Sequence, residues 1–364
     1  MGQAQTTLGA EGVLQNERWT LARRPAGAFD PVNDVVKVVE TIDTSTLAPG
    51  HVVIAMEMLS VDAFIRTMLD ADAYHGSVAL GATLPAMGYG TVVAAALDAK
   101  HHIGTRMLGL LGAQRYAVTS VGMPAGAMAV LSVPGMPLNS CLGLLSLTTG
   151  LAAYVGVFSV AKPPKAGEVV VVSAAAGAVG SVAAQLAKST GARVIGLAGG
   201  PTKKAFLLDV LKLDGAIDYK TGDLGEQLDA LAPDGVDFFF DNVGGSTLDV
   251  VLDRLKLRAR VVVCGAASQY SGDLNKGRDA QGRGGGVRGP ANYLKLAEKS
   301  STMVGFNVMH HFSSLPGALA SLCWMYSRGT VEMHEHVEKG LDAFPLALHK
   351  MFNQGHCGKL LVCP

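Results

Sequence analysis

Charged residues are scarce in this sequence, and the two signs are balanced. They make up 16% of the 364 residues, with 30 Lys and Arg against 30 Asp and Glu. A protein that binds nucleic acid needs a clustered basic surface, so the composition predicts no nucleic-acid partner. The chain also lacks an apolar run of about 18 residues, which argues against a membrane-spanning helix.

The first residues lack the basic start and the apolar core of a secretory signal. We therefore expect a cytoplasmic protein. Residues 1–16 are expected to be disordered. A short cleaved leader stays open as an alternative.

Cysteine occurs five times, and no two cysteines form a CxxC pair. This predicts neither a redox dithiol nor a four-cysteine zinc lobe, and it fits a reducing compartment. A zinc site needs about three or four ligands, whereas the only closely spaced histidine pairs are at 101–102, 310–311 and 334–336. We expect no bound metal.

Glycine is abundant instead, with 45 residues, and it marks the turns of two different patterns. Short β-like runs over residues 18–140 predict an antiparallel region. From residue 141 onward, short apolar runs alternate with helical segments, which predicts a parallel sheet covered on both faces. The ending KLLVCP is expected to return as a strand to the first region. We predict an α/β protein with domains 1–142 and 143–314, and with residues 315–364 rejoining the first domain.

The segment SAAAGAVGS, residues 173–181, follows the apolar run VVVV and leads into a helical pattern. Such a turn presents free backbone N–H groups at a helix start, which favours a phosphate. Gly177 would let the backbone approach a pyrophosphate, and Gly180 would let helix and strand pack closely. Ala174 stands where the usual fingerprint has its first glycine, and we expect its φ to be negative. Ala178 and Val179 complete this cofactor-binding set; a tight turn without a ligand is the alternative.

The end of the next strand distinguishes the two nicotinamide dinucleotides. NAD-binding proteins place an acidic residue there for the ribose hydroxyl, but ARVIGLAG is followed by Lys203 and Lys204 and by no acid. Because lysine attracts the 2′-phosphate, we expect NADP(H). The alternative is a solvated helix start.

The motifs LTTGLAAY, VVSAAAGAVGSVAAQLAK, DYKT, FDNVGG, CGAASQY and GPANY occur in this order between residues 147 and 293. The chain resembles the zinc-independent medium-chain dehydrogenase/reductases, and within them the leukotriene hydroxydehydrogenase, prostaglandin reductase and alkenal double-bond reductase group. The resemblance implies a GroES-like β domain and a Rossmann domain. It also implies NADPH-dependent reduction of the carbon–carbon double bond of α,β-unsaturated ketones or aldehydes. Quinone reduction and a non-catalytic NADPH-binding module stay as alternatives.

The resemblance also implies roles for single residues. Lys203 matches the lysine on the 2′-phosphate, and Tyr219 a tyrosine on the same side. Further cofactor contacts are implied for Asn242, Cys264, Gly265, Tyr270, Phe306, Asn307, Val308 and His356. The stretch 306–308 is expected to be a strand. His356 stands where relatives often have asparagine.

Conjugate reduction builds charge on the substrate carbonyl oxygen, which one or two hydrogen-bond donors can stabilise. Tyr270 is the candidate catalytic donor, with the cofactor ribose as its partner; mere packing against the cofactor is the alternative. Phe64, Arg66 and Tyr89 are candidate substrate-binding residues for a hydrophobic acceptor, although Phe64 replaces a tyrosine of many relatives and Arg66 has a bracing role as its alternative. The loop 271–289 is expected to be exposed, and either mobile or a lid. The stretch FNVMHHF, residues 306–312, is a candidate edge for a homodimer.

Overall fold

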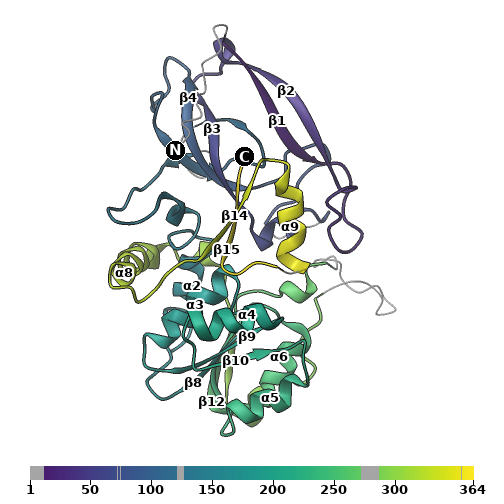
Figure 1. Cartoon of the computed structure of the whole chain (residues 1–364), viewed down its shortest axis with the longest axis vertical. Coiled ribbons are helices and arrows are strands. Elements are labelled where there is room, and N and C mark those ends of the chain that lie inside the picture. The colour runs from purple at the N-terminus through teal and green to yellow at the C-terminus, as the bar shows by residue number, and fades with distance from the viewer. Residues whose placement is uncertain (1–11, 72, 74, 121–126, 272–286, 354) are drawn as a thin grey trace.

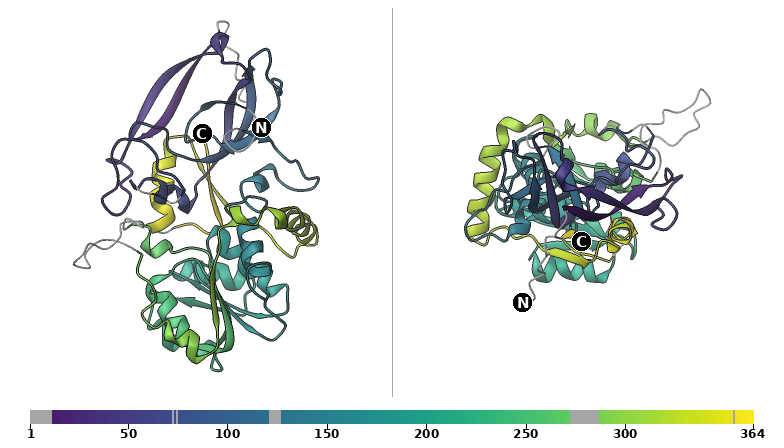
Figure 2. Two further views of the ribbon diagram at one scale, coloured as in Figure 1. Left: turned by 180° about the vertical axis from the view of Figure 1, so that it is seen from behind. Right: turned by 90° about the horizontal axis from the view of Figure 1, so that it is seen from above.

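The computed structural model describes residues 12–71, 73, 75–120, 127–271, 287–353 and 355–364. They form two lobes (Figure 1). The β-rich lobe contains the N-terminal strands, and β14, β15 and α9 from the end of the chain lie among them. The view from behind shows the same division (Figure 2, left).

The β-rich lobe is built on a sheet in the order β14-β15-β3-β4-β5-β7, with β6 beside β3. The pairings among its N-terminal strands are antiparallel, which confirms the expected pattern. Its strands are β3 (His51–Ser60), β4 (Met87–Ala95), β5 (Arg106–Leu110), β6 (Tyr116–Ser120), β7 (Met128–Ala129), β14 (Glu335–Lys339) and β15 (Lys359–Cys363). The helices of this lobe are α1 (Ala63–Met68) and α9 (Ala343–Asn353).

A separate antiparallel pair joins β1 (Val13–Leu21) to β2 (Val35–Asp43). The expectation that residues 1–16 are disordered is therefore wrong for residues 13–16, because Val13 to Asn16 pair with residues 40–43 of β2. Residues 1–11 lie outside the described part of the chain.

The second lobe contains a fully parallel sheet in the order β10-β9-β8-β11-β12-β13. Its strands are β8 (Val169–Val172), β9 (Arg193–Ala198), β10 (Gly215–Asp218), β11 (Val236–Asp241), β12 (Leu255–Val263) and β13 (Thr302–Gly305). Its helices are α2 (Gly150–Phe158), α3 (Ala178–Lys188), α4 (Pro201–Ala205), α5 (Leu224–Leu231), α6 (Gly245–Leu252), α7 (Leu294–Glu298) and α8 (Leu315–Ser327). The predicted α/β class is confirmed.

The run VVVV shows why this sheet is buried on both faces. Val170 and Val172 pack into one apolar cluster with α2, α3 and α8. Val169 and Val171 point to the other face and pack with α5 and α6. A strand buried on both faces has no polar alternation, so the four consecutive valines predict this environment.

The strand order reverses between β8 and β11, because the chain runs outward through β9 and β10 and then returns to the other side of β8. In open parallel sheets, ligands bind at the carboxyl ends of the strands at such a switch point. Residues that follow β8 and β11 are therefore candidates for the site.

The end of the chain completes the first lobe, as expected, since β15 pairs antiparallel with β3. The domain boundaries themselves remain a proposal. Helix α8 follows the proposed boundary between residues 314 and 315. Its buried residues Leu315, Ala318 and Leu322 nevertheless belong to the cluster around α2 and α3 in the second lobe.

None of the helices in the described residues combines the length and hydrophobicity that crossing a bilayer requires. Most of the loop expected at 271–289 lies outside the described residues.

A buried ion pair ties the last strand to helix α1. The Nζ atom of Lys359 lies 2.6 Å from Oδ1 of Asp62, and the two side chains are 1% and 5% exposed. Asp62 also accepts a hydrogen bond from the hydroxyl of Ser60. We predict that Lys359→Met lowers the free energy of unfolding by about 3–5 kcal/mol, because it leaves the Asp62 carboxylate buried without its cation.

Urea unfolding followed by circular dichroism measures this loss. Lys188→Met is the control, because Lys188 pairs with Asp214 at 3.1 Å on the surface, where such pairs contribute about 0–1 kcal/mol. Equal losses in the two variants would contradict the prediction.

Candidate active site

The turn after β8, residues 173–177, has the form expected of a phosphate site, with one difference in backbone conformation. We call it the phosphate turn. Gly177 is the N-cap of α3 and has φ −84°. A Cβ at Gly180 would overlap the carbonyl oxygen of Ala174, so the close packing predicted for this glycine is confirmed. The first N–H groups of α3, at Ala178 and Val179, lack partners within the helix and are the donors that suit an anion.

The expectation of a negative φ for Ala174 is wrong, because its φ is +48°. The left-handed conformation reverses the chain, so that the carbonyl of Ala174 accepts the N–H of Gly177 at 2.9 Å. The first position of the turn thus needs the same conformation whether glycine or alanine occupies it. Alanine pays for it in strain of roughly 1–2 kcal/mol.

The segment between α9 and β15 docks on this turn from the other lobe. The N–H of Gly358 donates to the carbonyl of Ala176 at 2.8 Å, and Gly358 bridges Gly177 in parallel orientation. Gly358 has φ +74°, and a Cβ there would overlap the carbonyl of His334. Glycine is therefore required where the two lobes meet at the turn.

His356, in the same segment, is 9% exposed, and its Nδ1 atom is buried without a hydrogen-bond partner in the structure. Burial, together with the nearby charges of Lys203, His336, Lys350 and Lys359, lowers the pKa of His356 to about 4. A neutral imidazole with an unsatisfied buried nitrogen, surrounded by cations, fits a site that receives an anionic or polar ligand.

Lys203 lies in α4, shortly after β9, and no carboxylate in the described residues pairs with it. Burial, assisted by the nearby charge of Lys220, lowers the pKa of Lys203. The hydroxyl of Tyr219 lies over Gly199, where a Cβ would clash with it, and the Tyr219 side chain is 48% exposed. These residues form a basic surface at the end of β9 that suits a 2′-phosphate, and the contact expected from the sequence remains a proposal.

Asn242 is turned toward the protein. Its Nδ2 donates to the carbonyl of Ser173 at 2.7 Å, and its backbone N–H donates to the hydroxyl of Ser173 at 2.8 Å. The side chain therefore shapes the start of the phosphate turn. Its predicted contact with the cofactor remains a proposal.

Residues 264–270 form a loop after β12 that we call the catalytic loop. The Tyr270 oxygen accepts the N–H of Ala266 at 3.2 Å, and the Tyr270 ring makes an edge contact with Phe352 of α9, with 6.4 Å between ring centroids. Tyr270 therefore lies where the two lobes meet. Burial raises the pKa of the Cys264 thiol to about 12, so that this cysteine stays protonated.

The strand predicted at 306–308 is wrong. Strand β13 ends at Gly305, and Val308–His310 form a 3₁₀ turn because Asn307 caps it, accepting the N–H of Met309 at 3.0 Å. Phe306 packs beside Gly156 of α2.

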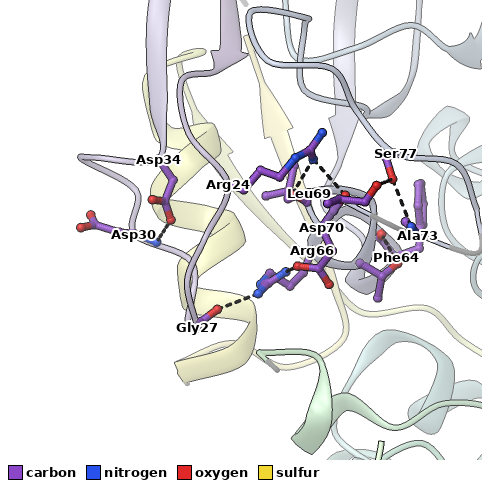
Figure 3. A network of polar contacts seen from close by, with 12 residues as sticks. Arg24, Gly27, Asp30, Asp34, Phe64, Arg66, Leu69, Asp70, Ala73 and Ser77 are labelled. Atoms are coloured by element: carbon purple, nitrogen blue, oxygen red, sulfur yellow. Dashed lines mark hydrogen bonds and ion pairs between the residues drawn. The ribbon is translucent and has the colours of Figure 1, made fainter. Parts of the chain in front are cut away.

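Arg66 lies inside the β-rich lobe rather than at its surface (Figure 3). It is 1% exposed, pairs with Asp70 at 2.7 Å, and donates to the carbonyl of Gly27 at 2.6 Å. Arg24 supports the same region by donating to the backbone carbonyls of Leu69 and Asp70. We revise the substrate-binding assignment of Arg66 to its bracing alternative, since both bonds hold the guanidinium within the lobe.

Tyr89 is also revised to a structural role. It is 5% exposed, and its hydroxyl donates to Asn139 at 2.7 Å, while Asn139 donates to Glu335 at 2.7 Å. Burial raises its pKa. Phe64 remains a candidate for substrate contact, because it is half-buried; its ring makes an edge contact with His75, with 6.1 Å between ring centroids.

The sequence analysis assigned no role to Ser173 and Asp241, which lie at the carboxyl ends of β8 and β11, on the two sides of the switch point. The Ser173 hydroxyl donates to Asp241 at 2.8 Å. An acidic residue at the end of an apolar strand, as in FFFD, is the signal that could have indicated their role.

Within the described residues, no group of three or more His, Cys, Asp or Glu side chains has the arrangement that could hold a metal ion. A cavity of about 130 Å³ lies beside Leu138 and Cys141, and one of about 370 Å³ lies beside Lys212 and Glu332; neither is lined by Gly177, Lys203 or Tyr270. The assignment of the site therefore rests on its polar groups and their placement at the switch point.

Comparisons with known proteins agree with this geometry. Residues 17–126 match the family model described as the N-terminal domain of oxidoreductase, and residues 178–322 match the one described as zinc-binding dehydrogenase. The chain is 34% identical to a 2-alkenal reductase (NADP(+)-dependent) of Nicotiana tabacum, over 86% of this chain and 87% of the relative. It is 32% identical to prostaglandin reductase 1 of Mus musculus, over 96% and 99%.

Among solved structures, the chain is similar to CurA from Vibrio vulnificus in complex with NADPH. The TM-score is 0.83 at 29% identity, over 95% of this chain and 98% of the other.

The conformation of Ala174 predicts that Ala174→Gly stabilises the protein. Relief of left-handed strain, about 1–2 kcal/mol, outweighs the entropy cost of glycine, about 0.5–1 kcal/mol, so the free energy of unfolding rises by about 0.5–1 kcal/mol. Ala178→Gly, at the start of α3, is the control and is expected to destabilise. Urea titration of both variants checks this, and a loss in Ala174→Gly contradicts the strain.

The depressed pKa of His356 predicts a pH-dependent stability. As pH falls from about 6.5 to 4, the unfolded chain binds a proton on this histidine before the folded chain does. Stability therefore falls by about 3 kcal/mol over this window and levels off below it. His356→Asn removes this contribution, whereas His349→Asn keeps it. Unfolding curves at pH 7 and 4.5 measure the free energy of unfolding that each variant loses, and equal losses in the two variants would contradict the prediction.

Proposed function

The chain belongs to the zinc-independent medium-chain dehydrogenase/reductases, in their alkenal and prostaglandin reductase group. From this premise we propose that it is an NADP-dependent oxidoreductase that reduces the carbon–carbon double bond of α,β-unsaturated aldehydes or ketones. The observation that carries the proposal is the convergence of the phosphate turn, the basic surface around Lys203 and the tyrosine of the catalytic loop at one end of the parallel sheet.

The residues present fit NADPH. The first N–H groups of α3 suit the pyrophosphate, and Lys203, without a carboxylate partner in the described residues, suits the 2′-phosphate. The buried, unpartnered Nδ1 of His356 supplies a further polar group beside Lys203. When bound, the cofactor supplies a hydride; the chain's own residues determine where it lies and what else is stabilised.

Tyr270 is proposed as the donor to the substrate carbonyl oxygen, on which negative charge develops during reduction. A phenol can donate one hydrogen bond while its oxygen accepts another, and here the oxygen accepts the N–H of Ala266. That bond, together with the contact to Phe352, fixes the direction of the ring. A donor held in place before the reaction stabilises the developing charge without reorganisation.

The proposed substrate is a small hydrophobic molecule. Phe64 and Met68 are half-buried in the first lobe, and with Arg66 engaged inside the lobe the region offers an apolar surface rather than a cationic one. An enal or enone without an anionic tail is therefore the class that we favour.

We also propose a homodimer, joined at the edge of the parallel sheet. The edge strand is β13, Thr302–Gly305, and not the stretch 306–312 that the sequence indicated. An exposed strand edge presents unpaired backbone groups to a second chain, and Met303 on this strand is 36% exposed.

The experiment is NADPH oxidation measured against a panel of enals, enones and quinones. We expect turnover of the enals and enones, and a fall in kcat of about 100- to 1,000-fold in Tyr270→Phe, because one lost donor to a developing oxyanion costs about 2.7–4 kcal/mol. Tyr154→Phe is the matched control, since the Tyr154 hydroxyl bonds Ser321 between α2 and α8.

Turnover of quinones alone would replace the proposed substrate class. Tight NADPH binding without turnover of any acceptor would indicate a non-catalytic module. An unchanged kcat in Tyr270→Phe would remove its role as a donor.

A further inference from the structure

Asp241, the last residue of β11, has a buried carboxylate that accepts hydrogen bonds from one side-chain hydroxyl and from two backbone N–H groups. It is 0% exposed. Its Oδ1 accepts the hydroxyl of Ser173 at 2.8 Å and the N–H groups of Val243 at 3.0 Å and Gly244 at 3.1 Å, and its Oδ2 accepts Gly244 at 3.1 Å. This set satisfies a charged group away from water, so the side chain has one fixed position.

The first partner, Ser173, begins the phosphate turn at the end of β8. Besides donating to Asp241, its hydroxyl accepts the N–H of Asn242, and its carbonyl accepts the Asn242 side chain. These bonds cross the switch point between β8 and β11, so the start of the phosphate turn and the end of β11 move together.

The backbone of residues 241–243 in turn holds the catalytic loop. The Asp241 carbonyl accepts the N–H groups of Cys264 at 2.8 Å and Gly265 at 3.2 Å. The carbonyls of Asn242 and Val243 accept the N–H groups of Ala267 and Ser268, and the Ser268 hydroxyl adds a bond of 2.6 Å to Val243. The loop that carries Tyr270 is thus bonded, residue by residue, to the segment that the Asp241 carboxylate fixes.

Two glycines allow this packing. Gly244 and Gly245 have φ values of +66° and +58°, in the left-handed region that favours glycine. A Cβ at Gly244 would press on Ala266 at 3.3 Å, and one at Gly245 would lie 3.0 Å from the Ser268 hydroxyl. The close approach of the two segments therefore needs both glycines.

We infer that Asp241 is a positioning residue that sets the spacing between the phosphate turn and the catalytic loop, and hence between the bound dinucleotide and Tyr270. The inference rests on the proposed function and deepens it. The carboxylate touches neither substrate nor reacting atoms; it acts through Ser173 and through the backbone of 241–243.

The test compares Asp241→Asn with Asp237→Asn. Asparagine keeps the shape of the side chain but replaces one accepting oxygen by an NH₂ group, which cannot accept the Gly244 N–H. Asp237 is the matched control at the opposite end of the same strand pair, where its Oδ2 accepts the N–H of Val169 at 2.8 Å and pairs with Lys256 at 3.0 Å.

We expect kcat with an enone to fall at least about 10-fold in folded Asp241→Asn, because displacement of reacting groups by about 1 Å can cost 100-fold. The dissociation constant for NADPH, measured by its fluorescence without acceptor, should rise at least several-fold. Asp237→Asn should change neither value by more than about twofold once it is shown to be folded by circular dichroism. Equal kinetic and binding behaviour of the two variants would overturn the inference.

Ser173 provides a second pair in case Asp241→Asn fails to fold. Ser173→Ala removes the hydroxyl that joins the two segments and should lower kcat and NADPH affinity, whereas Ser173→Thr keeps the hydroxyl and should restore both; failure of threonine to restore either would overturn the inference. If the wild-type protein reduces none of the acceptors, the proposed function fails, and the NADPH dissociation constants of these variants alone decide the positioning role.

Discussion

One backbone contact joins the two lobes at the candidate site: the N–H of Gly358 donates to the carbonyl of Ala176 in the phosphate turn. Because the segment 355–358 leads directly into β15, which pairs with β3, this contact fixes the β-rich lobe against the nucleotide-binding sheet. It brings His356 beside Lys203, and the neighbouring helix α9 brings Phe352 against Tyr270. The site is therefore a product of how the lobes meet, and neither lobe contains it alone.

Charged residues are scarce in the sequence, and the structure shows how the buried ones are paired. The most deeply buried ion pairs, Lys359 with Asp62 and Arg66 with Asp70, lie in the first lobe and serve packing. Lys203 differs, because it is partly buried and has no carboxylate partner in the described residues. A cation that is desolvated without being neutralised is costly for folding alone, so its placement is better explained by a ligand's anion than by stability.

The sequence predicts much of the second lobe, because local patterns there have one physical solution. Four consecutive valines require a strand buried on both faces, and the glycine at 180 requires a helix packed on its turn. Two of the failures, Arg66 and Tyr89, have a common cause, namely that a deciding partner lies far away in the chain. Nothing near Arg66 in sequence reveals that it bonds the carbonyl of Gly27, and nothing near Tyr89 reveals Asn139. Ala174 differs, because its left-handed φ is imposed by the turn even though alanine does not favour it.

Strands β14 and β15 are synthesised after every strand of the second lobe, yet β15 lies inside the first lobe's sheet, between β14 and β3. The parallel sheet of the second lobe has all its strands once residue 305 has been made, and domains generally fold as units during synthesis. The first lobe, although most of its strands are made earlier, cannot complete its sheet until residues 335–363 have been made. The two sheets therefore become complete in the reverse of the order in which they begin in the sequence, and the candidate site, which includes His356, is complete only after the second lobe's sheet.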